Sequence, residues 1–306
     1  MINSPHPSTS SGCPELVEGQ GTRRTQRPCW DLRPLGPRRF SFLLASLLAA
    51  SCGAPLMKLP AGPGAPAPDI RDVMTEATAK CRAVSSLTVE VAVSGSIGGR
   101  RVRARLAAGL ASPASARLEA FAFGQPIFIF VARASGATLL LTRGRRVLER
   151  GAPGEVLEAV AGVPLDAADL RTALLGCVVA PDLDSGRRLG DDWRIAAEVE
   201  SEVYLRREAR ARPWRLVAVA YHPPAQPAWR AEYRDFVDDL PRAVRFVSDD
   251  PSRFDLRLTL SQLDLNVKLD APAFEVTVPA GVDPITLDEL RRQGPLAGSP
   301  PGNDGR

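Results

Sequence analysis

The stretch of residues 87–108, LTVEVAVSGSIGGRRVRARLAA, decides the fold class of this chain. On both sides of Gly98 and Gly99, apolar residues alternate with polar ones, which is typical of a β-strand with one buried and one solvated face. A pair of glycines between two such strands favours a tight turn. The stretch therefore predicts an antiparallel hairpin.

Similar patterns continue along the chain after this hairpin. Further strands are predicted at residues 116–123, 126–133, 137–142, 193–200, 202–207, 214–221, 228–236, 242–247, 253–266 and 274–278. Helices are predicted at residues 69–81, 154–161, 166–175 and 286–292. Asp166 and Gly176 are a typical start and stop for the third of these helices. Because helices do not alternate with the strands, a parallel doubly wound sheet is excluded.

We therefore expect an α+β, mainly β fold, with one domain at residues 69–293. A sheet with this many strands has to curl. The helices within residues 154–176 interrupt the meander midway, which favours a position over the concave face. The expected architecture is a curved antiparallel sheet that forms an unclosed half-barrel with a helical lid.

The segment before this domain has the layout of an export signal. Residues 38–52 read RRFSFLLASLLAASC: two arginines, an apolar run, small residues and a cysteine. This order is typical of a bacterial lipoprotein signal peptide. It predicts that Cys52 carries a covalent lipid and becomes the first residue of the mature protein. The apolar run is shorter than the roughly 20 residues of a transmembrane helix.

The chain ends are interpreted in the same way. Residues 1–51 are the leader and signal peptide, and residues 1–37 are explained by a start codon assigned too far upstream. Residues 52–68, rich in Pro, Ala and Gly, are predicted to be a tether, and residues 294–306 a disordered tail. Residues 1–51 hold 6 of the 39 basic and 3 of the 35 acidic residues, so the net charge falls from +4 to +1 without them.

The charge pattern of the remaining chain does not indicate nucleic-acid binding. Arg101, Arg103 and Arg105 share one face of a strand, and Arg145, Arg146 and Arg150 follow nearby. Few aromatic residues alternate with these arginines, as they would in a single-strand binding surface. A solvated face or attraction to anionic lipid or to a partner remain as interpretations.

The sequence shows no motif that supports catalysis. The mature chain has one histidine, His222, in a Tyr-His-Pro-Pro turn. It has no Gly-x-Ser-x-Gly, no Cys/His pairing at metal spacing and no phosphate-binding glycine loop. We therefore predict a non-enzymatic protein without a metal or a cofactor other than the lipid on Cys52.

Three stretches resemble the LolA/LolB-like lipoprotein-localisation family. The hairpin tip FAFGQ at residues 121–125 stands where the family's outer-membrane receptor has Pro-Leu-Gly. AGVPLD at residues 161–166 leads into a helix with Leu170, Leu174 and a final glycine, as in the family's lid. Residues 233–260 are similar to its closing strands. The resemblance implies a half-barrel over an apolar cavity that binds acyl chains.

The resemblance also implies candidate site residues. Phe123 would be the exposed apolar hook of the receptor; the alternative is that it ends its strand and packs inward. The candidate cavity lining is Leu118, Phe128, Leu140, Val156, Val160, Leu170, Leu174, Trp229 and Tyr233. A close-packed core has the same composition as such a lining, so the residues alone leave both interpretations open.

Two cysteines remain in the predicted domain. Cys81 and Cys177 could form a disulfide in an oxidising compartment, or remain as two buried thiols. A disulfide would tie the first helix to the end of the lid.

The sequence leaves three functions open. The first is a lipid-anchored envelope protein, at the outer membrane facing the periplasm, that binds acyl chains of lipoproteins or phospholipid and receives cargo from a periplasmic carrier. The absence of an aspartate after Cys52 favours the outer membrane. The second is an envelope scaffold with a packed interior. The third is a sensor that acts through the segment after Asn266.

Overall fold

The computed structural model describes residues 55–178 and 185–293 of this 306-residue chain. The predicted signal peptide, Cys52 and the tail at residues 294–306 lie outside the described residues. The sheet, the helices and the core described below all belong to one compact unit, Met57–Arg306.

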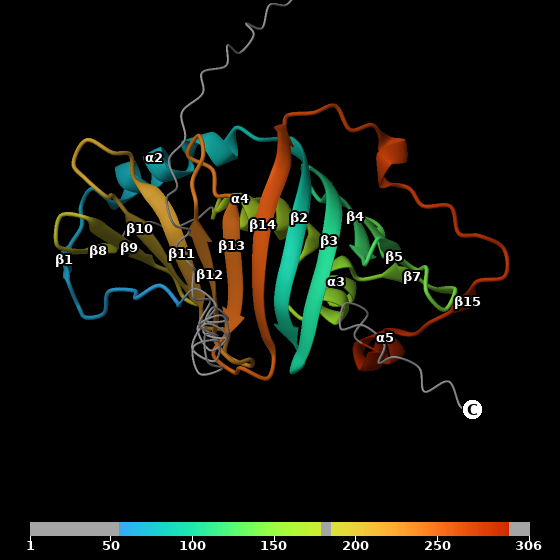
Figure 1. Ribbon diagram of the computed structural model, residues 1–306. Coiled ribbons are helices and arrows are strands. Elements are labelled where there is room, and N and C mark those ends of the chain that lie inside the picture. Colours follow the sequence, from blue (N-terminus) through green and yellow to red (C-terminus); the bar gives the residue numbers. More distant parts are fainter. Residues whose placement is uncertain (1–54, 179–184, 294–306) are drawn as a thin grey trace, which may run out of the picture. The chain divides into compact units, whose positions relative to one another are not determined.

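One sheet dominates this unit (Figure 1). In the described residues it contains 15 strands in the order β1-β8-β9-β10-β11-β12-β13-β14-β2-β3-β4-β5-β6-β7-β15. The first run of strands is β2 (Ser86–Ile97), β3 (Arg100–Ala111), β4 (Ser115–Ala122), β5 (Gln125–Arg133), β6 (Gly136–Leu141) and β7 (Arg146–Gly151). The second is β8 (Gly186–Leu189), β9 (Trp193–Ala197), β10 (Ser201–Arg206), β11 (Arg215–Tyr221), β12 (Trp229–Arg234), β13 (Ala243–Ser248) and β14 (Phe254–Leu265).

The two runs join where β14 pairs antiparallel with β2, from Phe254 opposite Ile97 to Leu265 opposite Leu87. The two-residue strands β1 (Ala65–Pro66) and β15 (Asp283–Pro284) end the sheet, on β8 and β7 respectively. These outer strands do not pair with each other in the described part, so the sheet stays open. Twist between neighbouring strands curls it. The predicted unclosed half-barrel is confirmed.

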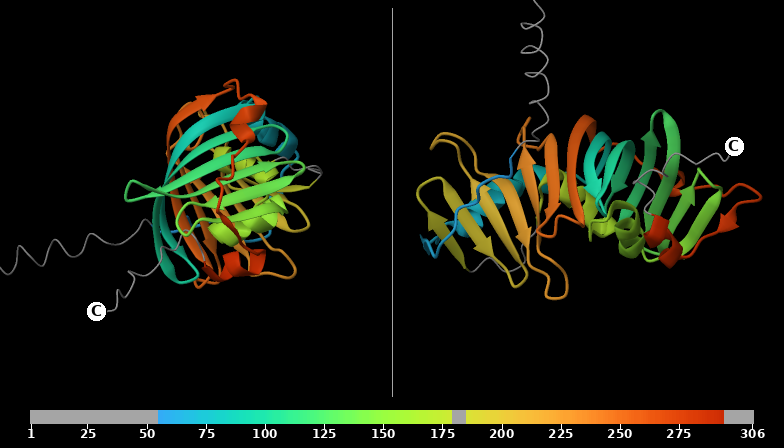
Figure 2. Two further views of the ribbon diagram at one scale, coloured as in Figure 1. Left: turned by 90° about the vertical axis from the view of Figure 1, so that its right-hand side faces the viewer. Right: turned by 60° about the horizontal axis from the view of Figure 1, so that its bottom comes forward.

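Helices occupy the inside of the curve. They are α2 (Ile70–Arg82), α3 (Pro153–Ala161), α4 (Ala167–Leu175) and α5 (Leu287–Gln293). Helix α2 packs on β9, β10 and β11, α3 on β6, and α4 on β3 and β4. Figure 2 shows the sheet curving around the yellow-green α3 and α4. No described helix is long and apolar enough to cross a bilayer.

The lid helices begin and end close to where the sequence predicts. Asp166 is the residue before α4, but its side chain makes no capping hydrogen bond. Gly176 follows α4 with a φ of 65°, a left-handed conformation that favours glycine. The inserted helical lid is therefore confirmed, with a C-terminal stop but without a side-chain N-cap.

The N-terminal segment of this unit differs from the predicted tether. From Met57 onward it runs along the outward face of the second run of strands. Met57 and Leu59 pack against a small apolar cluster that contains Ile195 and Tyr204. The backbone N–H of Met57 donates a hydrogen bond of 2.9 Å to Glu232 Oε1. The part of the stretch that follows Leu56 is therefore part of the folded unit.

The C-terminal segment covers the outward face of the first run in a similar way. A short 3-10 helix, η2 (Ala271–Phe274), packs on β4 and β5. The Arg117 guanidinium donates hydrogen bonds to the carbonyls of Ala273 and Glu275, at 3.3 and 2.6 Å. The strand predicted at residues 274–278 was wrong, since this segment lies across the sheet instead of along its edge. This cover explains why β5 is apolar on both faces.

Candidate functional site

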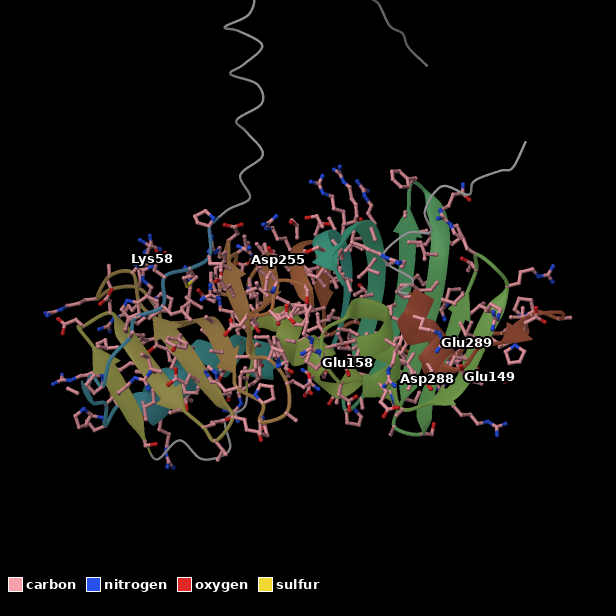
Figure 3. All side chains as sticks on the ribbon, turned by 90° about the horizontal axis from the view of Figure 1, so that it is seen from below. Lys58, Glu149, Glu158, Asp255, Asp288 and Glu289 are labelled. Atoms are coloured by element: carbon pink, nitrogen blue, oxygen red, sulfur yellow. A yellow bond between two sulfur atoms is a disulfide. The ribbon has the colours of Figure 1, made fainter. Side chains whose placement is uncertain are left out.

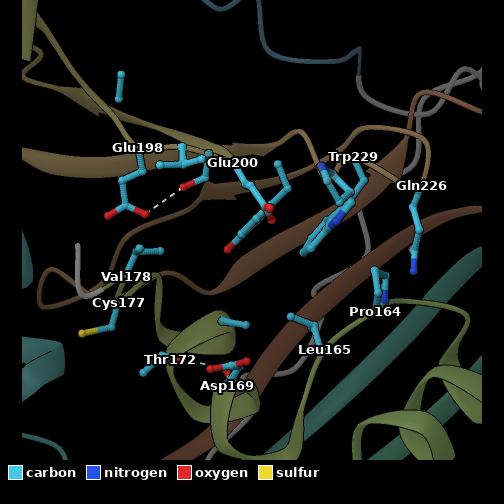
Figure 4. A pocket seen from close by; sticks show the side chains of 16 residues that line it. Pro164, Leu165, Asp169, Thr172, Cys177, Val178, Glu198, Glu200, Gln226 and Trp229 are labelled. Carbon is cyan, nitrogen blue, oxygen red and sulfur yellow. Dashed lines mark hydrogen bonds between the residues drawn. The ribbon is translucent and has the colours of Figure 1, made fainter. Parts of the chain in front are cut away.

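A cleft of about 1050 Å³ lies between helix α4 and strands β9 to β12 (Figure 4). The helix side contributes the loop before α4, one face of α4 and the two residues after Gly176. The sheet side contributes the β9–β10 turn and the ends of β11 and β12. The lining residues are Pro164, Leu165, Asp169, Thr172, Ala173, Cys177, Val178, Ala197, Glu198, Val199, Glu200, Ser201, Tyr221, Pro223, Gln226 and Trp229.

The helix wall is held in place at its C-terminal end. Cys177 forms a disulfide with Cys81 of α2, with a Cα–Cα distance of 5.7 Å. The Arg171 guanidinium of α4 donates a hydrogen bond to the carbonyl of Val84, which follows α2. A Cβ at Gly176 would come within 3.3 Å of the Tyr233 ring, so the helix end approaches the sheet closely. These contacts fix the position of α4 relative to α2 and β12.

The sheet wall is aromatic. The rings of Tyr221 and Trp229 are stacked, with centroids 4.0 Å apart and planes inclined by 12°. Trp229 also meets Phe246 and Phe254 edge-on, each with centroids 6.2 Å apart. Such packing fixes large side chains in one orientation. The cleft therefore has a rigid apolar wall that does not need to form upon binding.

The rim of the cleft is acidic. Asp169 lies on the α4 side, and Glu198 and Glu200 lie across from it on the sheet side (Figure 4). Burial, together with the nearby Asp166 carboxylate, raises the pKa of Asp169. Glu198 Oε2 accepts a hydrogen bond of 3.1 Å from the Ser201 hydroxyl, whereas its Oε1 is buried without a hydrogen-bond partner among the described residues.

The walls and the mouth of the cleft differ in their chemistry. The cleft combines apolar walls with carboxylates at the mouth, and none of the described residues that line it is a lysine or an arginine. Within residues 55–178 and 185–293, no group of three His, Cys, Asp or Glu side chains could hold a metal ion. An elongated apolar group is the ligand chemistry that fits these walls.

The predicted cavity lining has a different role in the structure. Eight of its nine residues belong to the main core, where the inner face of the sheet meets the lid helices: Leu118, Phe128, Val156, Val160, Leu170, Leu174, Trp229 and Tyr233. Of these eight, Trp229 also lines the cleft. The lid therefore fills the interior beside it, and the cleft described above lies alongside α4.

Leu140 was wrongly assigned to the concave face. It is paired with Ile129 and Val147 and alternates with Leu139 and Leu141, which do belong to the main core. Because successive side chains of a strand point to opposite faces, Leu140 lies on the outward face. Its neighbours there are apolar, so the composition of β6 did not show which face was which.

Phe123 lies at the tip of the β4–β5 hairpin and is 95% exposed. Its φ of 51° places it in the left-handed region, which is uncommon for a bulky residue. Val199, at the tip of the β9–β10 hairpin, is fully exposed as well. Strand pairing places both tips at the same edge of the sheet, where β2 ends and β14 begins.

The site residues that are not predicted from the sequence lie at the rim of the cleft. Asp169 falls inside the predicted lid helix, and Glu198 and Tyr221 fall at the ends of predicted strands. Each of them is an ordinary polar residue of an amphipathic element. Their one common signal is a position at or near the end of a helix or strand, and such a position does not by itself indicate that two ends face each other.

The comparisons with known proteins bear on the fold. No protein-family model matches this sequence, and no curated protein is significantly similar to it. A LolA superfamily protein from Nitrosomonas europaea superposes with a TM-score of 0.50 at 12% identity, covering 68% of this chain and 97% of that chain. A DUF1329 family protein from Desulfovibrio piger matches at a TM-score of 0.44 and 12% identity, covering 68% and 98%. The lipoprotein LppX from Mycobacterium tuberculosis matches at 0.29 and 10%, covering 65% and 99%.

The first of these structures carries the fold assignment. The match covers nearly the whole length of that structure. The chain therefore shares the fold of this LolA superfamily protein, which confirms the fold that the sequence resemblance implied.

Proposed function

We propose that this protein binds acyl chains of lipoproteins or phospholipid in the cleft between α4 and β9 to β12. The observation that carries the proposal is the cleft of about 1050 Å³ with apolar and aromatic walls. Its volume slightly exceeds the roughly 300–1,000 Å³ typical of small-molecule sites. Transfer of an acyl chain from water to such walls stabilises the complex by about 0.8 kcal/mol per buried methylene.

The proposed setting is the cell envelope. The signal-like residues 38–52 support export and a lipid on Cys52, and the LolA superfamily fold is consistent with a role in lipoprotein localisation. We propose that the anchored protein receives acylated cargo from a periplasmic carrier and helps place it in the outer membrane. No bond is made or broken in such a transfer, so no catalytic group is required.

Blocking the cleft tests this proposal. Thr172 lines the cleft from α4, and its hydroxyl donates to the carbonyl of Asp169. Thr172→Trp, in the chain from Ala54 onward, is expected to weaken binding of a fluorescent fatty-acyl probe at least about tenfold, because the indole occupies volume that the chain needs. Titration of the probe into the protein, followed by fluorescence, measures the effect.

A matched control is available on α2. Thr75 is exposed, and its hydroxyl donates to the carbonyl of Arg71 in the preceding turn of its helix. Thr75→Trp should therefore leave probe binding unchanged. Probe binding that survives Thr172→Trp, or no binding by folded wild-type protein, would contradict the proposal.

The second of these outcomes would favour a scaffold. The lid helices are packed into the main core, with Val156 and Val160 at 0% and 2% exposure, so the interior beneath them is closed. A folded protein that binds no acyl chain would use this rigid fold to position a protein partner instead.

The exposed tip supports a second step, delivery to the bilayer. Phe123 has no neighbour to pack on, and burial of its ring in a membrane or partner would contribute about 1.5–3 kcal/mol. Phe123→Asn is expected to slow transfer of a bound acyl probe to lipid vesicles about tenfold, since this burial is lost. The melting temperature should stay equal or rise, because asparagine tolerates the left-handed conformation better than phenylalanine does.

Stopped-flow fluorescence of probe transfer measures the rate. Val237→Asn, at a half-exposed position in the turn between β12 and β13 on the opposite edge of the sheet, is the control. An unchanged rate for Phe123→Asn would remove the tip from the delivery step.

A further inference from the structure

The outward face of β3 carries a ladder of three arginines: Arg101, Arg103 and Arg105. All three are exposed, and they occupy alternate positions of one strand. Their Cα atoms are therefore spaced by roughly 6–7 Å along the strand. Three like charges at this spacing repel one another.

The ladder is not neutralised by its surroundings. On β2 its cross-strand partners are Ser96, Ser94 and Ala92, none of which is charged. None of the three arginines has an ion pair among the described residues, whereas other outward-facing arginines of the sheet do. Examples are Arg117 with Glu119 at 2.6 Å, Arg133 with Glu275 at 2.9 Å and Arg245 with Asp255 at 2.8 Å.

Glu90 of β2 is paired with Ala107, so it lies beyond the Arg105 end of the ladder, and it is not the direct cross-strand partner of any of the three arginines. Other carboxylates of the region are engaged elsewhere. Asp255, on β14, binds Arg245 and also lies 3.5 Å from Arg257. Glu158 and Glu289 come from α3 and α5 and lie apart from Asp255 (Figure 3). They pair with Arg253 and Arg146, respectively. The positive charge of the ladder therefore faces solvent.

The terminal segments leave this part of the sheet uncovered. The N-terminal segment lies over the apolar cluster of β9 to β11, and η2 lies over β4 and β5. Between them, the outward-facing Ala92 and Ser94 of β2 and Thr259 of β14 are exposed. The ladder lies in this uncovered strip.

The register of β3 and β4 places the ladder beside the exposed tip. Arg105 is paired with Phe121, and β3 continues past this pair through Arg103 and Arg101 in the direction of Phe123. Two further exposed arginines, Arg100 and Arg143, lie at neighbouring hairpin tips on the same edge. Exposed cations next to an exposed aromatic ring are typical of a protein surface that binds a bilayer with anionic headgroups.

We propose that Arg101, Arg103 and Arg105 dock this edge of the sheet onto an anionic lipid surface, with Phe123 entering the bilayer beside them. An arginine close to an anionic bilayer strengthens binding about fivefold. The three together account for a gain on the order of a hundredfold. The docking does not depend on the cleft, so it stands apart from acyl-chain binding.

Vesicle binding tests the proposal. The chain from Ala54 onward lacks Cys52 and its lipid but contains the whole compact unit, so it reports the contribution of the protein surface. Wild type should co-sediment with phosphatidylcholine vesicles that contain phosphatidylglycerol, and binding should fall as salt is raised. The triple variant Arg101→Gln, Arg103→Gln, Arg105→Gln is expected to lose affinity on the order of a hundredfold. The corresponding triple Arg-to-Lys variant should keep most of it.

Three further measurements make the result specific. The triple variant Lys80→Gln, Arg82→Gln, Arg212→Gln removes the same charge from exposed positions outside the uncovered strip and should bind like wild type. The ladder variant should keep its melting temperature and its binding of a soluble acyl probe. Undiminished vesicle binding by the ladder variant, or an equal loss in the control variant, would overturn the proposal. If no variant bound the acyl probe, the proposal of acyl-chain binding in the cleft would fail, and the docking proposal would still be decided by the vesicle measurements.

Discussion

Replacing Glu232 with alanine is expected to lower the free energy of unfolding by about 3 kcal/mol. The Glu232 side chain is fully buried on the outward face of β12 and pairs with Arg230 at 3.1 Å and Arg234 at 3.0 Å. It also accepts the hydrogen bond from the Met57 backbone that holds the N-terminal segment. Alanine removes the carboxylate from two cations and one amide at once. This expected loss lies at the low end of the range for a broken buried ion pair, because both arginines keep some contact with water.

Chemical denaturation followed by tryptophan fluorescence measures this change. Glu275→Ala is the matched control, since Glu275 pairs with Arg133 in a position where its side chain is 62% exposed. A surface pair of this kind is worth less than about 1 kcal/mol. Equal effects of the two substitutions would contradict the interpretation of Glu232 as the buried anchor of the N-terminal segment.

Removal of the disulfide is expected to have an effect of similar or larger size. Cys81 and Cys177 are separated by 96 residues, so their bond shortens a long loop of the unfolded chain. The double variant Cys81→Ala, Cys177→Ala should lower the free energy of unfolding by about 3–5 kcal/mol. It should also weaken acyl-probe binding, because the bond holds one end of the α4 wall.

Reduction of the wild type provides the control for this double variant. Wild-type protein treated with dithiothreitol should unfold at the same denaturant concentration as the untreated double variant, and the double variant should not respond to the reductant. A wild type whose unfolding midpoint does not change on reduction would show that the bond does not contribute to stability.

The strands that the sequence predicts correctly are those with clear alternation. Residues 87–108 fall within β2 and β3, and the alternating leucines near 256–260 fall within β14. Strands β7 and β8 are not predicted from the sequence, because both are short and rich in arginine and neither has two buried positions that alternate with exposed ones. Their pairing partners, more than the residues within them, place them in the sheet.

The terminal segments were misinterpreted for a related reason. The stretch before residue 69 has the composition of a linker, with Met57 and Leu59 as isolated apolar residues. Met57 meets Glu232, 175 residues further along the chain. A local pattern carries no information about a partner at that distance. The same holds for Phe274, which is buried through a segment that crosses the sheet.

The sequence by itself determined the mainly β architecture and the helical interruption at its middle. These features follow from alternation, helix stops and turn residues, all of which act over a few neighbouring positions. The tertiary structure alone decided where the open space lies and what covers each face of the sheet. Whether a buried leucine faces a cavity, a lid or a terminal segment depends on packing between distant elements, and the same apolar residue satisfies all three.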